Sequence, residues 1–113
     1  MINSELIDKL HGFDRPTDRI LIEFPNEGGP YRSPGDLVPL VGTKDTIIET
    51  VHPRNNMVVH DLFVELTDHP LDGKVQLFLN QGGSHPVAYY DIGSVRLRGK
   101  AGVVITAGEL IAT

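Results

Sequence analysis

Five histidines are the side chains best suited to hold a metal ion, because imidazole is the commonest transition-metal ligand in proteins. Metal sites built on a strand use two histidines one residue apart, so that both side chains point to the same face, and no His-x-His pair occurs. His52, His69 and His85 each precede a proline in an expected turn, and only His60 is expected to point inward from a strand. The spacing therefore predicts no metal site and no cofactor.

Residues that could act as nucleophiles or as acid and base catalysts lack the spacing that such chemistry needs. No serine lies in a Gly-x-Ser-x-Gly motif, and the adjacent side chains of Ser84 and His85 are expected to point apart. Asp61 and Glu65 share one face of an expected strand, but lie about 13 Å apart, which is too far for paired catalysis. We therefore expect no catalytic residues and a protein that is not an enzyme.

A tyrosine pair beside a polar, glycine-rich loop could bind a carbohydrate. Adjacent residues on a strand point to opposite faces, so either Tyr89 or Tyr90 is expected to be exposed beside this loop. That ring would be a stacking platform, and Asn80, Gln81 and Asp91 would supply hydrogen-bonding groups. Carbohydrate-binding sandwiches rely on tryptophan, which this chain lacks. A carbohydrate or small-ligand site is the alternative prediction, and a tyrosine at an oligomer interface explains the pair equally well.

The composition indicates one soluble globular domain. Of the 113 residues, 40% are hydrophobic and 22% are charged, which suits a single core and is unlike a disordered chain. The formal net charge of -5 disfavours nucleic acid as a partner. Cysteine is absent, and no stretch approaches the roughly 18 consecutive apolar residues of a membrane span. The N-terminus does not resemble a signal peptide. We expect an intracellular protein that contacts neither nucleic acid nor a membrane.

Residues 1–18 are predicted to form an N-terminal arm that carries a short helix. Ser4 can cap this helix, Leu6, Ile7 and Leu10 would share one side of it, and Gly12 can end it. A helix of this length is unstable alone in water, so we expect it to dock on its own sheet or on a neighbouring subunit. Residues 19–113 are assigned to the main domain.

The main domain is predicted to be all-β, because short segments of alternating apolar residues are separated by turns. Strands are expected at 19–24, 46–51, 57–67, 74–80, 87–92, 95–98 and 101–113, with an edge strand or connector at 37–41. This number and spacing favour an antiparallel β-sandwich or jelly roll. Asp72-Gly73 predicts a hairpin between 57–67 and 74–80. The residues expected to point inward from three of the strands are Ile20, Ile22, Phe24, Val75, Leu77, Leu79, Val95 and Leu97. A bulge, bend or tight turn is expected at Ala107-Gly108. No internal repeat is detected.

A β domain with an arm, long Gly/Pro-rich loops and exposed apolar positions suits an assembly module whose surface neighbouring subunits cover. Arg96 and Arg98 form a basic row that could meet an acidic partner, and an ordinary solvated strand face explains them too. The residues expected at an interface are Leu6, Ile7, Leu10, Tyr31, Phe63, Arg96 and Arg98.

Residues 57–113 resemble the small jelly-roll cement, decoration and vertex proteins of viral capsids, particularly those of tailed phages. The resemblance lies in predicted architecture, size and lack of cysteine, without a diagnostic motif. It implies a homo-oligomer that binds the outside of a protein shell, such as one of major capsid protein, through many weak contacts. It also implies location on the virion surface; otherwise a cytoplasmic protein is expected. The predicted function is thus that of a non-enzymatic capsid accessory protein.

Overall fold

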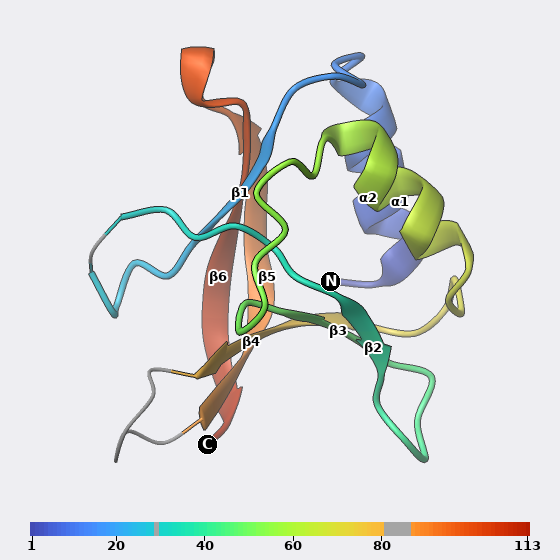
Figure 1. Ribbon diagram of the computed structural model, residues 1–113. Helices are drawn as coiled ribbons and strands as arrows, with labels where there is room; N and C mark the ends of the chain where they lie inside the picture. Colours follow the sequence, from blue (N-terminus) through green and yellow to red (C-terminus); the bar gives the residue numbers. More distant parts are fainter. Residues whose placement is uncertain (29, 81–86) are drawn as a thin grey trace.

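The computed structural model describes residues 1–28, 30–80 and 87–113. In this part, the protein is mostly β, with one curled six-stranded sheet and two short α-helices (Figure 1). The β-rich prediction is confirmed. A two-sheet sandwich or jelly roll is not, because all the strands belong to one sheet that contains parallel pairs. The elements are α1 (Asn3–Gly12), β1 (Ile20–Glu23), β2 (Leu37–Pro39), β3 (Thr46–Glu49), α2 (Val59–Thr67), β4 (Val75–Asn80), β5 (Val87–Leu97), the 3-10 helix η1 (Gly99–Ala101) and β6 (Val103–Ala112).

The strand order of the sheet is β1-β6-β5-β4-β3-β2. β1 is parallel to β6 and β3 is parallel to β4, whereas the other neighbours are antiparallel. The segment before β2 joins the two ends of the curl. The backbone of Arg32 exchanges two hydrogen bonds of 2.7 and 2.8 Å with Ile22 of β1, and the Gly35 N–H donates to the Glu49 carbonyl of β3 at 2.7 Å. The sheet is therefore nearly closed on itself.

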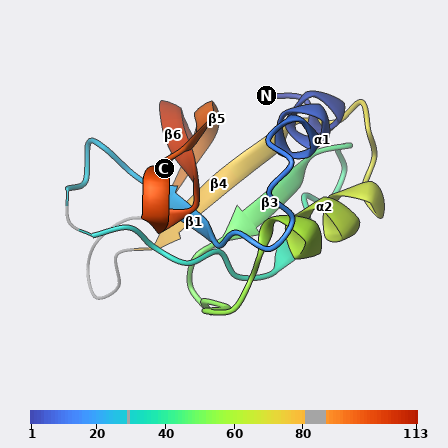
Figure 2. The ribbon, with the colours of Figure 1, turned by 90° about the horizontal axis from the view of Figure 1, so that it is seen from above.

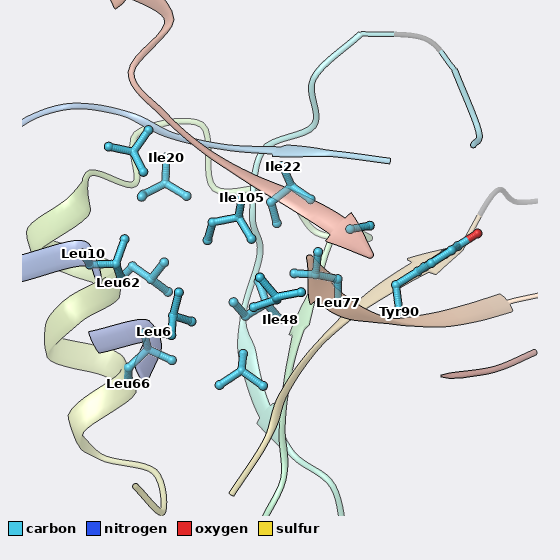
Figure 3. Close-up of a cluster of buried hydrophobic side chains, with 14 of the residues drawn as sticks. Leu6, Leu10, Ile20, Ile22, Ile48, Leu62, Leu66, Leu77, Tyr90 and Ile105 are labelled. Atoms are coloured by element: carbon cyan, nitrogen blue, oxygen red, sulfur yellow. The ribbon is translucent and has the colours of Figure 1, made fainter. Parts of the chain in front are cut away.

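The hydrophobic core lies between the inner side of the curled sheet and the two helices, which pack side by side (Figures 1 and 2). Figure 3 shows the helix leucines facing strand residues such as Ile48, Leu77 and Ile105. Full burial of one such side chain contributes about 1.5–3 kcal/mol to the free energy of folding. The residues expected to point inward from β1 and β4 are buried, which confirms that part of the prediction: Ile20, Ile22, Phe24, Val75, Leu77 and Leu79. Leu97, which was also expected to point inward, is 41% exposed, and Val95 is partly buried.

Residues 59–67 form helix α2, so the strand predicted over 57–67 and its hairpin with 74–80 are wrong. Val59, Leu62 and Leu66 are buried, and their spacing of three and four residues fits one face of a helix. Leu62 and Leu66 also satisfy the alternation of a strand, which explains the error. The Asp61 carboxylate accepts a hydrogen bond of 3.1 Å from the Val58 N–H and caps the first turn. His60, which was expected to point inward, is exposed.

Helix α1 belongs to the protein's own core. Leu6 and Leu10 have exposed fractions of 0% and 1%. The buried Asn3 amide donates to the carbonyl of Leu66 at 2.9 Å, and at longer range to those of His69 and Pro70. These bonds join the start of α1 to the end of α2. The helix was expected to dock either within its own chain or on a neighbouring subunit, and in the structure it packs within its own chain.

The two halves of the chain, residues 1–50 and 57–113, repeat one unit of a helix followed by three strands. In this repeat, β1 is equivalent to β4, β2 to β5 and β3 to β6, and the strand pairs of the sheet follow the same equivalence. The pair β1–β6 is equivalent to β4–β3, and β5–β6 is equivalent to β2–β3. The β4–β5 pair is matched by the bridge between Ile22 of β1 and Arg32, which precedes β2. The backbone hydrogen bonds repeat as well. The N–H of Asn3 donates to Gly73 and the equivalent N–H of Val59 donates to Asp18, both at 2.8 Å. The next residues repeat this, with Ser4 donating to Leu71 and His60 donating to Pro16, both at 3.0 Å. At the last strands, Thr46 donates to Lys74 at 2.8 Å and Val103 donates to Arg19 at 2.9 Å.

This internal repeat corrects the sequence prediction that none exists. Each half gives its first strand to the last strand of the other half, since β1 pairs with β6 and β4 pairs with β3. Neither half therefore completes its sheet alone. The arrangement is that of a two-fold dimer joined into one chain.

The repeat identifies Thr46 as a polar residue in an apolar position. Thr46 is 1% exposed and its hydroxyl has no hydrogen-bond partner, while the equivalent residue in the second half is Val103. We expect Thr46→Val to raise the free energy of unfolding by about 1 kcal/mol, because the cost of an unpaired buried hydroxyl disappears. Urea denaturation measures this.

Thr50→Val is the matched control for this substitution. The Thr50 hydroxyl donates to the Phe78 carbonyl at 2.9 Å, so its loss should lower the free energy of unfolding by about 1 kcal/mol. Equal destabilisation by both substitutions would contradict the assignment of Thr46.

Candidate functional site

Several residues predicted to lie at an interface are engaged within the chain itself. Arg96 donates to the Glu23 carboxylate at 2.9 Å, and the Nε and one Nη of Arg98 donate to the Tyr31 hydroxyl, at 3.1 and 2.9 Å. Arg96 lies in β5 and Arg98 directly follows β5, so both residues of the basic row have acceptors within the chain. Leu6 and Leu10 are buried core residues and cannot reach a neighbouring subunit, which corrects their prediction. Ile7 and Phe63 are partly exposed.

Of the residues predicted to bind a carbohydrate, Tyr90 points into the core, whereas Asn80, Tyr89 and Asp91 lie along the opposite face of the β4–β5 pair. Tyr90 is 5% exposed and its hydroxyl donates to the Glu27 carboxylate at 2.7 Å, which together with burial raises the pKa of Tyr90 to about 12. Tyr89 packs against Phe78 with ring centroids 5.1 Å apart. Asp91 accepts hydrogen bonds from the Met1 amino group and the Ile92 N–H. Asn80 lies at the exposed end of β4, and Gln81 lies outside the described residues. A flat tyrosine platform is therefore not formed by Tyr90.

Within residues 1–28, 30–80 and 87–113, no group of three or more histidine, aspartate or glutamate side chains could hold a metal ion. His11 and His60 both lie near Phe63, with ring centroids 6.0 and 6.5 Å from the phenylalanine ring. Neither described α-helix has the length and apolar character needed to cross a membrane.

The outer side of β2, β3 and β4 carries a shallow apolar pocket of about 350 Å³, with the Glu49 carboxylate at its edge. This carboxylate accepts three backbone hydrogen bonds, from Asp36 at 2.7 Å, Val51 at 2.7 Å and His52 at 2.9 Å. Burial alone would raise the pKa of Glu49, but the three N–H donors outweigh burial and lower it. The Glu49 side chain therefore links the end of β3 to Asp36, just before β2, and to the turn that follows β3.

Because the pKa of Glu49 is lowered, the contribution of its carboxylate to the free energy of unfolding depends on pH. A carboxyl group whose pKa is lower in the folded than in the unfolded state stabilises the fold at neutral pH, and this stabilisation is lost as pH falls through the folded pKa. We expect Glu49→Gln to lower the free energy of unfolding at pH 7. The difference from the unmodified protein should shrink below about pH 4.5, the ordinary pKa of this group. Urea denaturation at pH 7, 5, 4 and 3 measures the difference, and the exposed Glu5→Gln is the control. A difference independent of pH would contradict this role.

A second surface pocket, of about 320 Å³, lies between the end of α1 and the start of α2. The buried side chains of Leu10 and Val59 form part of its lining, together with Phe63 and the two histidines beside it. Arg15 and Asp14 lie at the same pocket, on the segment that follows α1. We call this pocket the interhelix groove. Its residues come from both halves of the repeat. The groove could not be predicted from the sequence, because residues 57–67 were assigned to a strand.

Among the described residues, no strand pairs with the outer edge of the last part of β6. β1 covers the outer edge of β6 only from Val103 to Thr106, and beyond that point every described backbone hydrogen bond of β6 is made to β5. Leu110 and Ile111 are each 48% exposed, and Val87 at the start of β5 is 36% exposed. Residues 107–112 of β6 with these side chains are called the β6 edge. Figure 1 shows this ribbon extending away from the helices toward the C-terminus.

Gly93 and Gly108 let the β5–β6 ribbon bend just before this edge. A Cβ atom on Gly108 would lie 2.9 Å from the Gly93 Cα, so only glycine allows the two backbones to come so close. Register shifts between β5 and β6 occur from Tyr89 to Ser94. Such irregularities increase the twist of a strand pair and can terminate pairing with a third strand. Ala107-Gly108 was expected to mark a bulge, bend or tight turn.

Comparisons of the chain with protein-family models, curated proteins and solved structures found no match in any of the three.

Proposed function

We propose that the protein is a non-enzymatic assembly module that associates with a second copy of itself along the β6 edge. The proposal rests on the outer edge of β6 beyond Thr106, which pairs with no strand in residues 1–28, 30–80 and 87–113 and carries exposed apolar side chains. A sheet edge of this kind offers a row of N–H and C=O groups that an extended strand can complete. Leu110 and Ile111 are adjacent, so they point to opposite faces, and a partner strand would cover apolar surface on both faces.

The β6 edge is complementary to itself. If two copies pair in antiparallel orientation around Leu110, each Leu110 lies opposite its counterpart and each Glu109 lies opposite Ile111 of the second copy. No two like charges then lie directly opposite, which such pairs require for stability. This pairing is isologous, as in a two-fold dimer, and it closes after two subunits. The β2 edge is a weaker candidate, because it is three residues long and ends in Pro39.

Attachment of this assembly to a viral protein shell is the finer form of the proposal. It rests on the size of the chain and its lack of cysteine, because the jelly-roll architecture on which the resemblance also depended is not found. A dimer would present each of its weak contacts twice, which raises the overall affinity for a symmetric shell.

Sedimentation velocity over a range of concentrations tests self-association. We expect a monomer–dimer equilibrium with a dissociation constant between about 10 µM and 1 mM, since a short strand edge buries less area than a stable interface needs. The variant Leu110→Lys/Ile111→Lys should be monomeric at every concentration and keep its circular dichroism spectrum. Val41→Lys, at an apolar side chain that is 94% exposed on a distant loop, should dimerise normally. A monomer at about 1 mM, or a dimer unaffected by the double substitution, would overturn the proposal.

A further inference from the structure

The interhelix groove lies where the two halves of the repeat differ at one helix position. Asn3 and Val59 are equivalent: each is the first residue of its helix, each is buried, and each backbone N–H bonds to the other half at 2.8 Å. The Asn3 amide fastens the end of α2 and the segment after it through three carbonyl groups. Val59 has no donor that could fasten the end of α1 in the same way. The pocket of about 320 Å³ lies beside Val59.

The segment after α1 also differs from its counterpart. Nine residues separate Leu10 from Ile20, whereas eight separate the equivalent residues Leu66 and Val75. The backbone hydrogen bonds from the start of α2 to this segment, Val59 to Asp18 and His60 to Pro16, match those of its counterpart. At the groove, the two halves therefore differ in this one extra residue and in the missing amide.

The lining of the groove defines the kind of molecule that fits it. Its floor is apolar and carries the phenylalanine ring of Phe63, with the His11 and His60 rings nearby. Flat rings prefer to pack against other rings in offset or edge-to-face geometry. Arg15 adds a permanent positive charge, and the two imidazoles can donate N–H groups, whereas Asp14 is the one acidic residue in the lining. The volume lies at the lower end of the range for small-ligand sites.

We propose that the interhelix groove binds a small planar aromatic carboxylate, with its ring against Phe63 and near the two histidines and its carboxylate at Arg15. Arg15 is suited to this role because a guanidinium pairs with a carboxylate through two parallel hydrogen bonds. This binding site is independent of self-association, because the β6 edge is on a different part of the fold from the two helices (Figures 1 and 2).

Titration of the ¹⁵N-labelled protein with 2-naphthoate tests this site by amide chemical shifts. We expect shifts confined to residues around the groove and a dissociation constant on the order of 1 mM, which is the affinity that a ligand of this size reaches at ordinary efficiency. Acetate, which has the charge without the ring, should cause no saturable shifts. The uncharged 2-naphthylmethanol should bind about tenfold more weakly. Equal binding of the alcohol and the acid, or shifts scattered over the whole surface, would overturn the proposal.

Four variants separate binding at the groove from general effects on the fold. Phe63→Ala and Arg15→Gln should each weaken 2-naphthoate binding at least tenfold, and Arg15→Gln should leave the binding of the alcohol unchanged. Ile7→Ala is the matched control, because Ile7 is equivalent to Phe63 on the other helix and lies outside the groove. Val59→Asn should abolish binding, because the new amide can hydrogen-bond the end of α1 as the Asn3 amide bonds the end of α2, and this would close the groove. Unchanged binding in Arg15→Gln, an exposed position that should not affect folding, would overturn the proposal even if the core variants fail to fold.

Discussion

Replacing Leu6 by alanine is expected to lower the free energy of unfolding by about 3 kcal/mol. Leu6 is fully buried between α1, α2 and the sheet (Figure 3), so truncation removes apolar contacts and leaves a cavity that the surrounding strands cannot fill. In a domain of this size, the melting temperature should fall by roughly 10 °C or more. Differential scanning calorimetry measures the loss, which should not depend on protein concentration.

The exposed Leu71 provides the control for this substitution. Leu71→Ala removes a side chain of the same size that is 53% exposed, and it should change the free energy of unfolding by less than about 0.5 kcal/mol. If α1 instead docked on a neighbouring subunit, Leu6→Ala would weaken association and leave the monomer's stability unchanged. That result would contradict the intramolecular position of the helix.

Gly73→Ala is expected to be as damaging as the loss of a core leucine, at about 3 kcal/mol. A Cβ atom at this position would lie 1.8 Å from the Lys44 carbonyl oxygen and 2.5 Å from its carbon, so the backbone itself must move. The affected segments are those that begin the parallel β3–β4 pair, where the Thr46 N–H donates to the Lys74 carbonyl at 2.8 Å. Overpacking of this kind strains both strands.

Gly12→Ala tests whether the loss of stability in Gly73→Ala comes from a steric clash and not from replacing glycine by alanine as such. Gly12 is the last residue of α1, and a Cβ atom there would meet nothing within 4 Å. Alanine should be neutral or stabilising by up to about 1 kcal/mol, because it favours the helix over the unfolded chain. Urea denaturation of both variants gives the comparison. Similar stabilities for the two variants would show that β3 and β4 do not approach each other as described.

The sequence predicted the strands correctly where a period of two residues was the only pattern that fitted. The inward sets of β1 and β4 alternate strictly, and both are buried in the structure. Around residue 62, the same leucines fit a period of 2 and a period of 3.6, and the β-branched valines favoured a strand. Tertiary packing decided in favour of a helix, because one face of α2 completes the core next to α1.

The internal repeat carries a sequence signal that could have corrected this error. The spacing between Leu6 and Leu10 recurs between Leu62 and Leu66, and each half continues with an alternating strand, Ile20-x-Ile22-x-Phe24 or Val75-x-Leu77-x-Leu79. Aligning the halves assigns 59–67 to a helix, by analogy with the predicted N-terminal helix. The exchange of strands between halves has no such signal, because it depends on long-range pairing of β1 with β6 and of β3 with β4.

The candidate sites were harder to predict than the strands. Arg96 and Arg98 looked available from the sequence, but their acceptors are brought to them by β1 and the segment after it, more than 60 residues away in the chain. The β6 edge follows from where β1 ends, and the interhelix groove follows from a difference between equivalent residues. Neither property belongs to a local pattern.

The exchanged pairing of the two halves determines both the β6 edge and the interhelix groove, and NMR distance measurements test it most directly. We expect nuclear Overhauser effects between the backbones of Ile20 and Val103 and between those of Thr46 and Val75, in parallel register. Backbone contacts between residues 57–67 and 74–80 in antiparallel register, with none between the first and last strands, would contradict the fold and both proposals.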